Sequence, residues 1–540
     1  MTRRVRRAIA ALLLALVALF ALPSSPVSAH ASLVQSDPAA NSVVATSPTS
    51  VVLTYDENIE ASTASISLFD AKGAKISIGA PKSGASAAVV QATVPTLKDG
   101  IYAVVWRVTS EDGHVVDGAF SFQVGTASTG GGQDLVDQVL NGARVPTATA
   151  WWYGVARFLS LMGATLLIGT GMWGMQGDPR LDAQRGVRRA VLVGCIAFVV
   201  GSLACFGLFG ASVKAGGISD AFKPSVWGDI ASTHTGRMLL MRIAMSLVLA
   251  VLLSLRRHDR LDVWGAAAVT AAIVAIFSFS ASGHPNALRP KTLWITLDAI
   301  HLGAITVWVG GLIALALATK AWFLEPRALL VVKSFSMVAL VSVPVIIATG
   351  VAQSLKLAGG LHDISATTWG RFLLGKVMLV VAMIAVAGVT RWLLHHDGVA
   401  SIRRTVLAEA VIGVLVVGLA AGMVAQAPRA SAPSRPYNEQ VTADGVIAAV
   451  TISPGHVGSN EVHIVVTPPG GSITPVAGVS GRVLLPSANL PAAPITLQQI
   501  GPNHYSGTVT IPRSGEWTLE LIVSTTISDS VLLKGTVQIP

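Results

Sequence analysis

Cysteine and charge are both scarce in this sequence. Its 540 residues include two cysteines, Cys195 and Cys205, which lie in one apolar segment. A helix would separate them by roughly 15 Å at about 1.5 Å per residue, which is too far for a disulfide. Only 12% of the residues are charged, whereas 52% are hydrophobic. This composition excludes an ordinary soluble protein and indicates a polytopic membrane protein.

Features of nucleotide-using and nucleic-acid-binding proteins are also missing. The sequence has no Gly-rich phosphate-binding loop, so we expect no nucleotide partner. Its formal net charge is +10, but no basic face with interleaved aromatic residues accompanies that charge, so we expect no nucleic-acid partner. We attribute the positive charge to loops on the cytoplasmic side of a membrane.

The first residues have the pattern of a signal peptide. Residues 2–7 are mostly basic, residues 9–22 are apolar, and Val27 and Ala29 precede a signal-peptidase site. We predict a signal peptide over residues 1–29, whose removal makes His30 the first residue. A terminal histidine binds one metal ion through its α-amine and its ring, and Cu(II) displaces the amine proton best among divalent first-row ions. Cleavage a residue or two away would make His30 incidental.

Residues 30–125 have a β pattern of short alternating runs between Gly, Pro, Asp and Asn turns, which predicts a sandwich or barrel. Near its end, Asp112 and His114 point the same way if the segment is extended. Two nitrogens of His30, one of His114 and the Asp112 carboxylate make an N₃O set, which suits Cu(II). We therefore predict an exported Cu(II) site.

Eight apolar segments of spanning length follow, and they predict a transmembrane bundle over residues 150–427. Lys and Arg concentrate after segments one, three, five and seven, which places those loops in the cytoplasm and both ends of the bundle outside. Residues 126–149 and 428–437 are predicted linkers, and residues 438–540 a second exported β-sandwich. The expected location is the cytoplasmic membrane, with multiple passes and with N- and C-terminal domains that are extracytoplasmic.

Ionisable residues inside or beside the apolar segments indicate a path for a metal ion. His301 lies about 12 Å into segment five, and Asp298 shares its helical face. His284 closes segment four, and His234 precedes segment three. The alternative is that Asp298 orients His301 as a buried structural pair, with the other two histidines interfacial. We interpret the C-terminal histidines 456, 463 and 504 as surface residues.

The exported β segment resembles the copper-resistance CopC family. The resemblance rests on four stretches, His30-Ala31-Ser32-Leu33, Leu53–Glu57, Gly100–Tyr102 and Ser110–Gly118. It implies a cupredoxin-like β-barrel that holds Cu(II) through the positions of His30, Asp112 and His114, with Glu57 as a further carboxylate near the metal. The Met-rich Cu(I) loop of some relatives is not expected, because no methionine lies between residues 30 and 125.

The helical segment resembles CopD, the membrane partner of CopC. Its resembling motifs are Ser282-Gly283-His284, Asp298–His301, Trp308–Gly311 and Trp369–Arg371. The order of the two domains in one chain is similar to the YcnJ-type fusion, which implies copper uptake into or across the membrane. Met238, Met241 and Met245 recur at helical spacing on segment three, where their thioethers could hand on Cu(I), although such a stripe is more often packing. The expected partners are copper ion and the lipid bilayer, and a copper reductase or copper chaperone is left open as a further partner.

The predicted function is therefore copper import and homeostasis by a protein that is not an enzyme. Three alternatives stay open: tolerance by extracytoplasmic sequestration, delivery of copper to a respiratory oxidase, and an oxidative copper enzyme built on the N-terminal histidine. Asp112 argues against the enzyme, because its carboxylate fills a coordination position that oxygen would need.

Overall fold

The computed structural model describes residues 31–539 except 32, 41, 126–134, 137, 140–144, 177–183, 256–262, 359–363, 366, 397–401, 425, 427–436, 454, 456, 472–473 and 488–489. The described chain forms two compact units. One contains residues 145–430 together with Glu111–His114, and the other contains residues 31–110, 115–144 and 431–540. The predicted signal peptide 1–29 and His30 lie outside the described residues.

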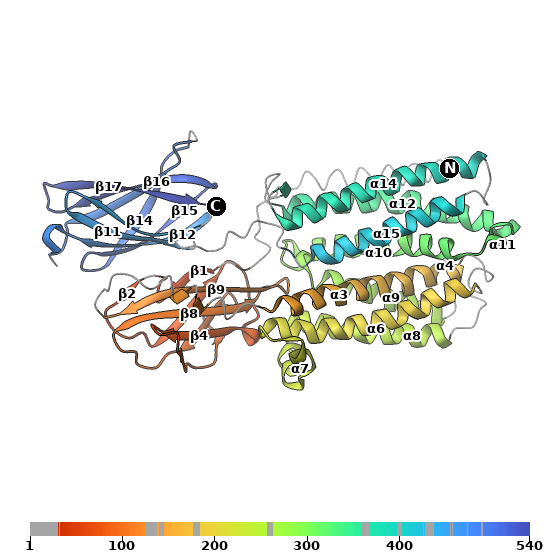
Figure 1. The fold of residues 1–540 in the computed structure, drawn as a ribbon, viewed down its shortest axis with the longest axis horizontal. Helices are drawn as coiled ribbons and strands as arrows, with labels where there is room; N and C mark the ends of the chain where they lie inside the picture. Colours follow the sequence, from red (N-terminus) through yellow and green to blue (C-terminus); the bar gives the residue numbers. More distant parts are fainter. Residues whose placement is uncertain are drawn as a thin grey trace. The chain divides into compact units, whose positions relative to one another are not determined.

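The first β domain consists of two sheets (Figure 1). The four-stranded sheet has the order β1-β3-β7-β6, and the five-stranded sheet the order β2-β9-β8-β4-β5. The strands are β1 (Leu33–Asp37), β2 (Val43–Val44), β3 (Ser50–Tyr55), β4 (Ser65–Asp70), β5 (Lys75–Ile76), β6 (Lys82–Ser83), β7 (Val89–Thr93), β8 (Gly100–Thr109) and β9 (Val115–Val124).

Alternating apolar residues fill the space between these two sheets. Leu53 and Val104 are fully buried there, and the ring of Tyr55 meets the ring of Trp106 edge-on at 5.4 Å. Strands β8 and β9 pair antiparallel along ten residues each. This long hairpin fixes the four-residue turn Glu111–His114 at its end.

Within the predicted linker 126–149, some residues have defined structure. Leu135, Val136 and Val139 are buried, and they pack against Ala103 and Val105 of β8. The first long helix begins at Thr147, also within that range.

The helical region contains eight helices that are long and apolar enough to span a membrane, counted over the described residues. The elements are α3 (Thr147–Ala164), η2 (Thr165–Thr170), α4 (Gly171–Gln176), α6 (Arg185–Val213), η3 (Ile218–Phe222), α7 (Pro224–Ala231), α8 (His234–Leu255), α9 (Val263–Ser280), η4 (His284–Asn286), α10 (Lys291–Leu317), α11 (Lys320–Phe323), α12 (Pro326–Leu357), α14 (Thr368–His396) and α15 (Arg403–Met423). Segments α3, η2 and α4 continue one another and form the first span.

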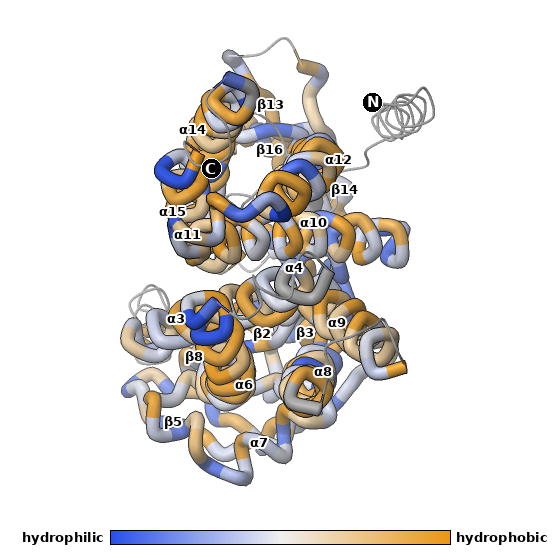
Figure 2. Tube along the Cα trace, turned by 90° about the vertical axis from the view of Figure 1, so that its right-hand side faces the viewer, coloured by the Kyte–Doolittle hydropathy of each residue, from blue (hydrophilic) through white to orange (hydrophobic). Residues whose placement is uncertain are grey.

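The helices consist mostly of hydrophobic residues (Figure 2), and many of their apolar side chains are exposed, as lipid contact requires. On α6, for example, Leu192 is 60% exposed and Ile196 is 55% exposed. The chain is a multi-pass membrane protein, and the predicted number of spans is confirmed over the described residues.

Two glycines allow an especially close crossing between the first span and α10. A Cβ on Gly169 would lie 2.0 Å from the carbonyl oxygen of Thr306, and a Cβ on Gly310 would lie 2.6 Å from the backbone of Gly169. The Thr170 hydroxyl donates a hydrogen bond of 3.0 Å to the Gly310 carbonyl at the same point. Small residues at such crossings let helix backbones approach within a membrane.

The C-terminal domain is one eight-stranded sheet in the order β10-β11-β12-β15-β14-β13-β16-β17, whose end strands β10 and β17 contact each other. Trp517, Leu519 and Leu521 of β16 are fully buried inside it. The elements are β10 (Tyr437–Ala443), β11 (Val446–Ser453), β12 (Gly458–Thr467), η6 (Pro469–Gly471), β13 (Gly478–Leu484), β14 (Ala493–Gly501), β15 (His504–Ile511), β16 (Gly515–Ser524) and β17 (Ser530–Ile539). The predicted fold class, a CopC-like β domain, an eight-helix bundle and a C-terminal β-sandwich, is confirmed.

Candidate metal centre

The turn between β8 and β9 carries Asp112 and His114. We expected these residues to align as neighbours on one face of an extended strand, and that geometry is wrong because the segment Glu111–His114 is a turn. Gly113 reverses the chain with a φ of 83°, a left-handed conformation that favours glycine. It also lies against α8, since a Cβ there would meet the Thr235 hydroxyl at 2.5 Å.

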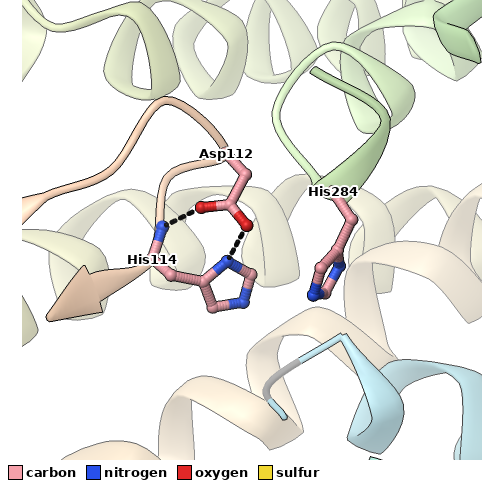
Figure 3. A group of neighbouring side chains, drawn as sticks. All are labelled: Asp112, His114 and His284. Atoms are coloured by element: carbon pink, nitrogen blue, oxygen red, sulfur yellow. Dashed lines mark hydrogen bonds and ion pairs between the residues drawn. The ribbon is translucent and has the colours of Figure 1, made fainter. Parts of the chain in front are cut away.

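The Asp112 carboxylate itself orients His114 (Figure 3). Its Oδ1 accepts a hydrogen bond of 3.1 Å from the backbone N–H of His114, and its Oδ2 lies 2.9 Å from His114 Nδ1. Burial disfavours a charged ring, but the Asp112 carboxylate outweighs this effect, and the pKa of His114 is raised above its ordinary value. His114 Nε2 lies 2.7 Å from the Val424 carbonyl oxygen. Both ring nitrogens thus face oxygen acceptors, a setting that favours a cation at this ring.

His284 supplies the third side chain of the group. It begins the short turn η4 after α9, is 5% exposed, and directs its ring toward that of His114, with 4.7 Å between ring centroids (Figure 3). Each of Asp112, His114 and His284 offers a ligand atom, and these three atoms lie within 4.8 Å of one another. One carboxylate and two imidazoles at this spacing can hold a single transition-metal ion, and nitrogen and oxygen donors suit Cu(II).

Glu111 ties the turn to the segment that follows η4. Its Oε2 lies 2.6 Å from Arg289 Nη2, and its Oε1 lies 3.1 Å from Lys291 Nζ. The Asn286 side-chain amide donates a hydrogen bond to the Glu111 carbonyl. Burial opposes ionisation of Glu111, but its hydrogen bonds to the two cations lower the pKa of its carboxyl below the ordinary value. The ligands on the turn and the ligand on η4 are therefore held together by charge.

Arg242 of α8 fixes the end of α9 and the chain as far as Ser282, which lies two residues before His284. Its guanidinium donates hydrogen bonds to the Ser278 hydroxyl (3.2 Å), the Ser278 carbonyl (3.0 Å) and the Ser282 hydroxyl (2.8 Å). It also lies 3.7 Å from the centroid of the Phe279 ring. Arg242 is 4% exposed, so it lies inside the bundle. From there it fixes the end of α9, which His284 follows in the chain.

Two further predicted ligands belong to residues 30–125. His30 lies outside the described residues. Glu57 is half-buried just after β3, and the metal-binding group of described residues does not include it. Both stay predictions.

The metal-binding group of described residues does not include the residues predicted to continue the path. His234 is the first residue of α8, and Asp298 and His301 are in α10. His301 is 6% exposed, and its Nδ1 is 2.8 Å from the Thr349 hydroxyl on α12. The path through them stays a prediction.

Reasoning from the sequence missed the residues that hold the turn, above all Glu111 and Asn286. A signal was present, because Glu111 adjoins the Asp112–His114 pair while Arg289 and Lys291 closely follow His284. The opposite charges beside the two ligand-bearing segments were the clue.

Comparison with known proteins identifies the class. Residues 33–125 match the model of the CopC domain, residues 148–287 that of the copper resistance protein D-like N-terminal domain, and residues 329–423 that of copper resistance protein D. The chain belongs to the CopC/CopD copper-resistance family and carries both domains in one polypeptide. Asp298 and His301 fall between the two membrane matches.

Among individual relatives, the chain is similar to the copper transport protein CutJ of Bacillus subtilis (strain 168), at 27% identity over 457 residues, which cover 81% of this chain and 82% of CutJ. It is 28% identical to the inner membrane protein YebZ of Escherichia coli (strain K12) over 44% of this chain and 82% of YebZ. The crystal structure of CopC from Methylosinus trichosporium OB3b is 34% identical and covers 18% of this chain and 98% of that one, with a TM-score of 0.18.

Proposed function

We propose that this protein captures Cu(II) outside the cytoplasmic membrane and passes copper into or across that membrane. The observation that carries the proposal is the joint group of Asp112, His114 and His284. Two of these ligands come from the CopC match and one from the membrane match. Copper on the capture turn therefore already has a ligand from the helical domain.

The chemistry of the group supports Cu(II) as the captured ion. One carboxylate and two imidazoles give an N₂O set, and the terminal amine and ring of His30 would add nitrogens. Asp112 is 1% exposed and His284 is 5% exposed, so little water competes at these ligands. A divalent ion can take the place of the proton that lies between His114 and Asp112, because the negative charge of the Asp112 carboxylate balances the positive charge of the ion.

Inward passage would proceed by ligand exchange. In this scheme His284 keeps the copper when the capture turn releases it, and His301 and Asp298 of α10 are the next ligands. A copper reductase would reduce the ion to Cu(I) during this step. In the same scheme, the N- and C-terminal domains are both extracytoplasmic. Copper is cargo here, so the protein needs no catalytic residue.

The test is copper accumulation in a deletion strain grown under copper scarcity and complemented with the wild type, His114→Gln or His284→Gln. We expect both variants to fall to the level of the deletion strain. His396→Gln is the matched control, since His396 is exposed at the end of α14. Wild-type accumulation by His284→Gln would refute passage through this residue.

A His301→Gln strain separates import from sequestration. If the membrane domain is only an anchor, His301→Gln keeps wild-type copper tolerance while His114→Gln loses it. Electron paramagnetic resonance of the purified full-length protein gives an independent check, because His284→Gln should remove one nitrogen from the Cu(II) spectrum.

A further inference from the structure

Two histidines of the C-terminal domain, neither of them a member of the candidate metal centre, lie side by side on neighbouring strands. His463 is on β12 and His504 is on β15, and these strands pair antiparallel with His463 opposite Ser506 and Val465 opposite His504. The two histidines are therefore diagonal neighbours, and 5.7 Å separates their ring centroids. His463 is 7% exposed, so its interpretation as a surface residue is wrong.

The strand alternation places both rings on the face of the sheet opposite the core. Val462, Ile464 and Tyr505, which alternate with them, belong to the apolar core of the domain. The histidines are thus not members of that core. Glu461 and Ser506 share their face.

Glu461 orients the His463 ring. Its Oε1 lies 3.0 Å from His463 Nε2, and the Ser506 hydroxyl lies 3.4 Å from the same nitrogen. When Nε2–H donates to the carboxylate, Nδ1 carries the lone pair. His463 Nδ1 and His504 Nε2 are both buried, and neither has a hydrogen-bond partner among the described residues. A buried ring nitrogen without a partner is costly unless a ligand satisfies it.

A carboxylate that holds one nitrogen of a histidine while the other stays available is the usual support of a metal ligand. We propose that His463, through Nδ1, and His504, through Nε2, form a second copper site on the C-terminal sheet, with Glu461 as a positioning residue. Imidazole nitrogens suit copper, and among divalent first-row ions Cu(II) binds such donors most tightly. This site is independent of the capture turn.

The test uses the full-length protein in detergent, in a background with His30→Gln, Asp112→Asn, His114→Gln and His284→Gln. Equilibrium dialysis against Cu(II) measures the copper bound per chain. We expect this background to retain a copper ion that either His463→Gln or His504→Gln removes. Glu461→Gln should weaken binding about 10- to 100-fold, as loss of an outer carboxylate typically does. His396→Gln, at an exposed histidine, should change nothing.

Folding is checked by the thermal unfolding midpoint without copper, which should match between the background and its His504→Gln variant. Added Cu(II) should then raise the midpoint in the background and not in that variant. Equal copper binding with and without His463 and His504 would overturn the site. Tighter binding of Zn²⁺ than of Cu(II) would overturn the choice of metal. Because the background already lacks the capture ligands, neither result depends on the uptake experiment.

Discussion

Exchange of Glu111 for glutamine should loosen the turn that carries Asp112 and His114. The substitution keeps the size of the side chain and removes the charge that pairs with Arg289 and Lys291. It leaves every candidate metal ligand in place. Any effect therefore reports on how the turn is held against the segment after His284.

The magnitude follows from the exposure of the groups. The Glu111 side chain is 16% exposed, but those of Arg289 and Lys291 are 52% and 38% exposed, so solvent screens both pairs. Each such pair contributes about 0.2–1 kcal/mol. Loss of both lowers the free energy of opening the turn by roughly 0.4–2 kcal/mol, which corresponds to about a 2- to 30-fold rise in the open population.

Hydrogen exchange measured by mass spectrometry on the full-length protein gives this population directly. Exchange at the His114 amide, which donates to Asp112, should accelerate by the same factor at low salt, and the difference should shrink near 1 M salt. Glu520→Gln is the matched control, because Glu520 pairs with Arg482 and Lys534 in the C-terminal sheet. Unchanged exchange of the turn in Glu111→Gln at low salt would refute the reasoning.

Three further predictions concern the metal centre. The first is measured by titrating Cu(II) affinity between about pH 5 and 8. As the pH is lowered, affinity should begin to fall at a pH above the ordinary histidine pKa, because the pKa of His114 is raised and protons compete with the metal for its ring. If affinity begins to fall only at or below the ordinary histidine pKa, the prediction is wrong. Second, Gly113→Ala should lower Cu(II) affinity and reduce the stability measured by thermal unfolding by about 1–2 kcal/mol, because Gly113 has a positive φ and lies close to the Thr235 hydroxyl. Wild-type stability and affinity in this variant would show that the turn does not need a glycine here. Third, Arg242→Met should remove three hydrogen bonds at the end of α9 and so reduce the His284 contribution to the Cu(II) electron paramagnetic resonance spectrum. An unaltered spectrum would show that Arg242 does not position His284.

Local patterns were enough to predict most of the fold. A helix that crosses a bilayer needs a long run of apolar residues, so the spans are visible one by one in the sequence. Strands of the β domains alternate between a buried and an exposed face, which is also a local property. The turn at Glu111–His114 escaped this reasoning, because a single glycine with positive φ ends the alternation there.

The composition of the metal centre depends on tertiary contacts that no local pattern contains. Asp112 and His114 could be selected because they are close in sequence, whereas their contact with His284 requires the turn to meet the end of α9. The pair His463 and His504 was missed for a similar reason. Their proximity follows from the register between β12 and β15, which the sequence does not specify.

The close crossing of Gly169 and Gly310 limits how the bundle can change shape during the proposed passage of copper. There is no space for even a methyl group between the two backbones, so α10 cannot slide past the first span without separating from it. His301 lies on the same helix, and its ring contacts α12 through Thr349. We therefore expect α10 to stay fixed against the first span and α12 to be the element that shifts, if copper takes the proposed path past His301.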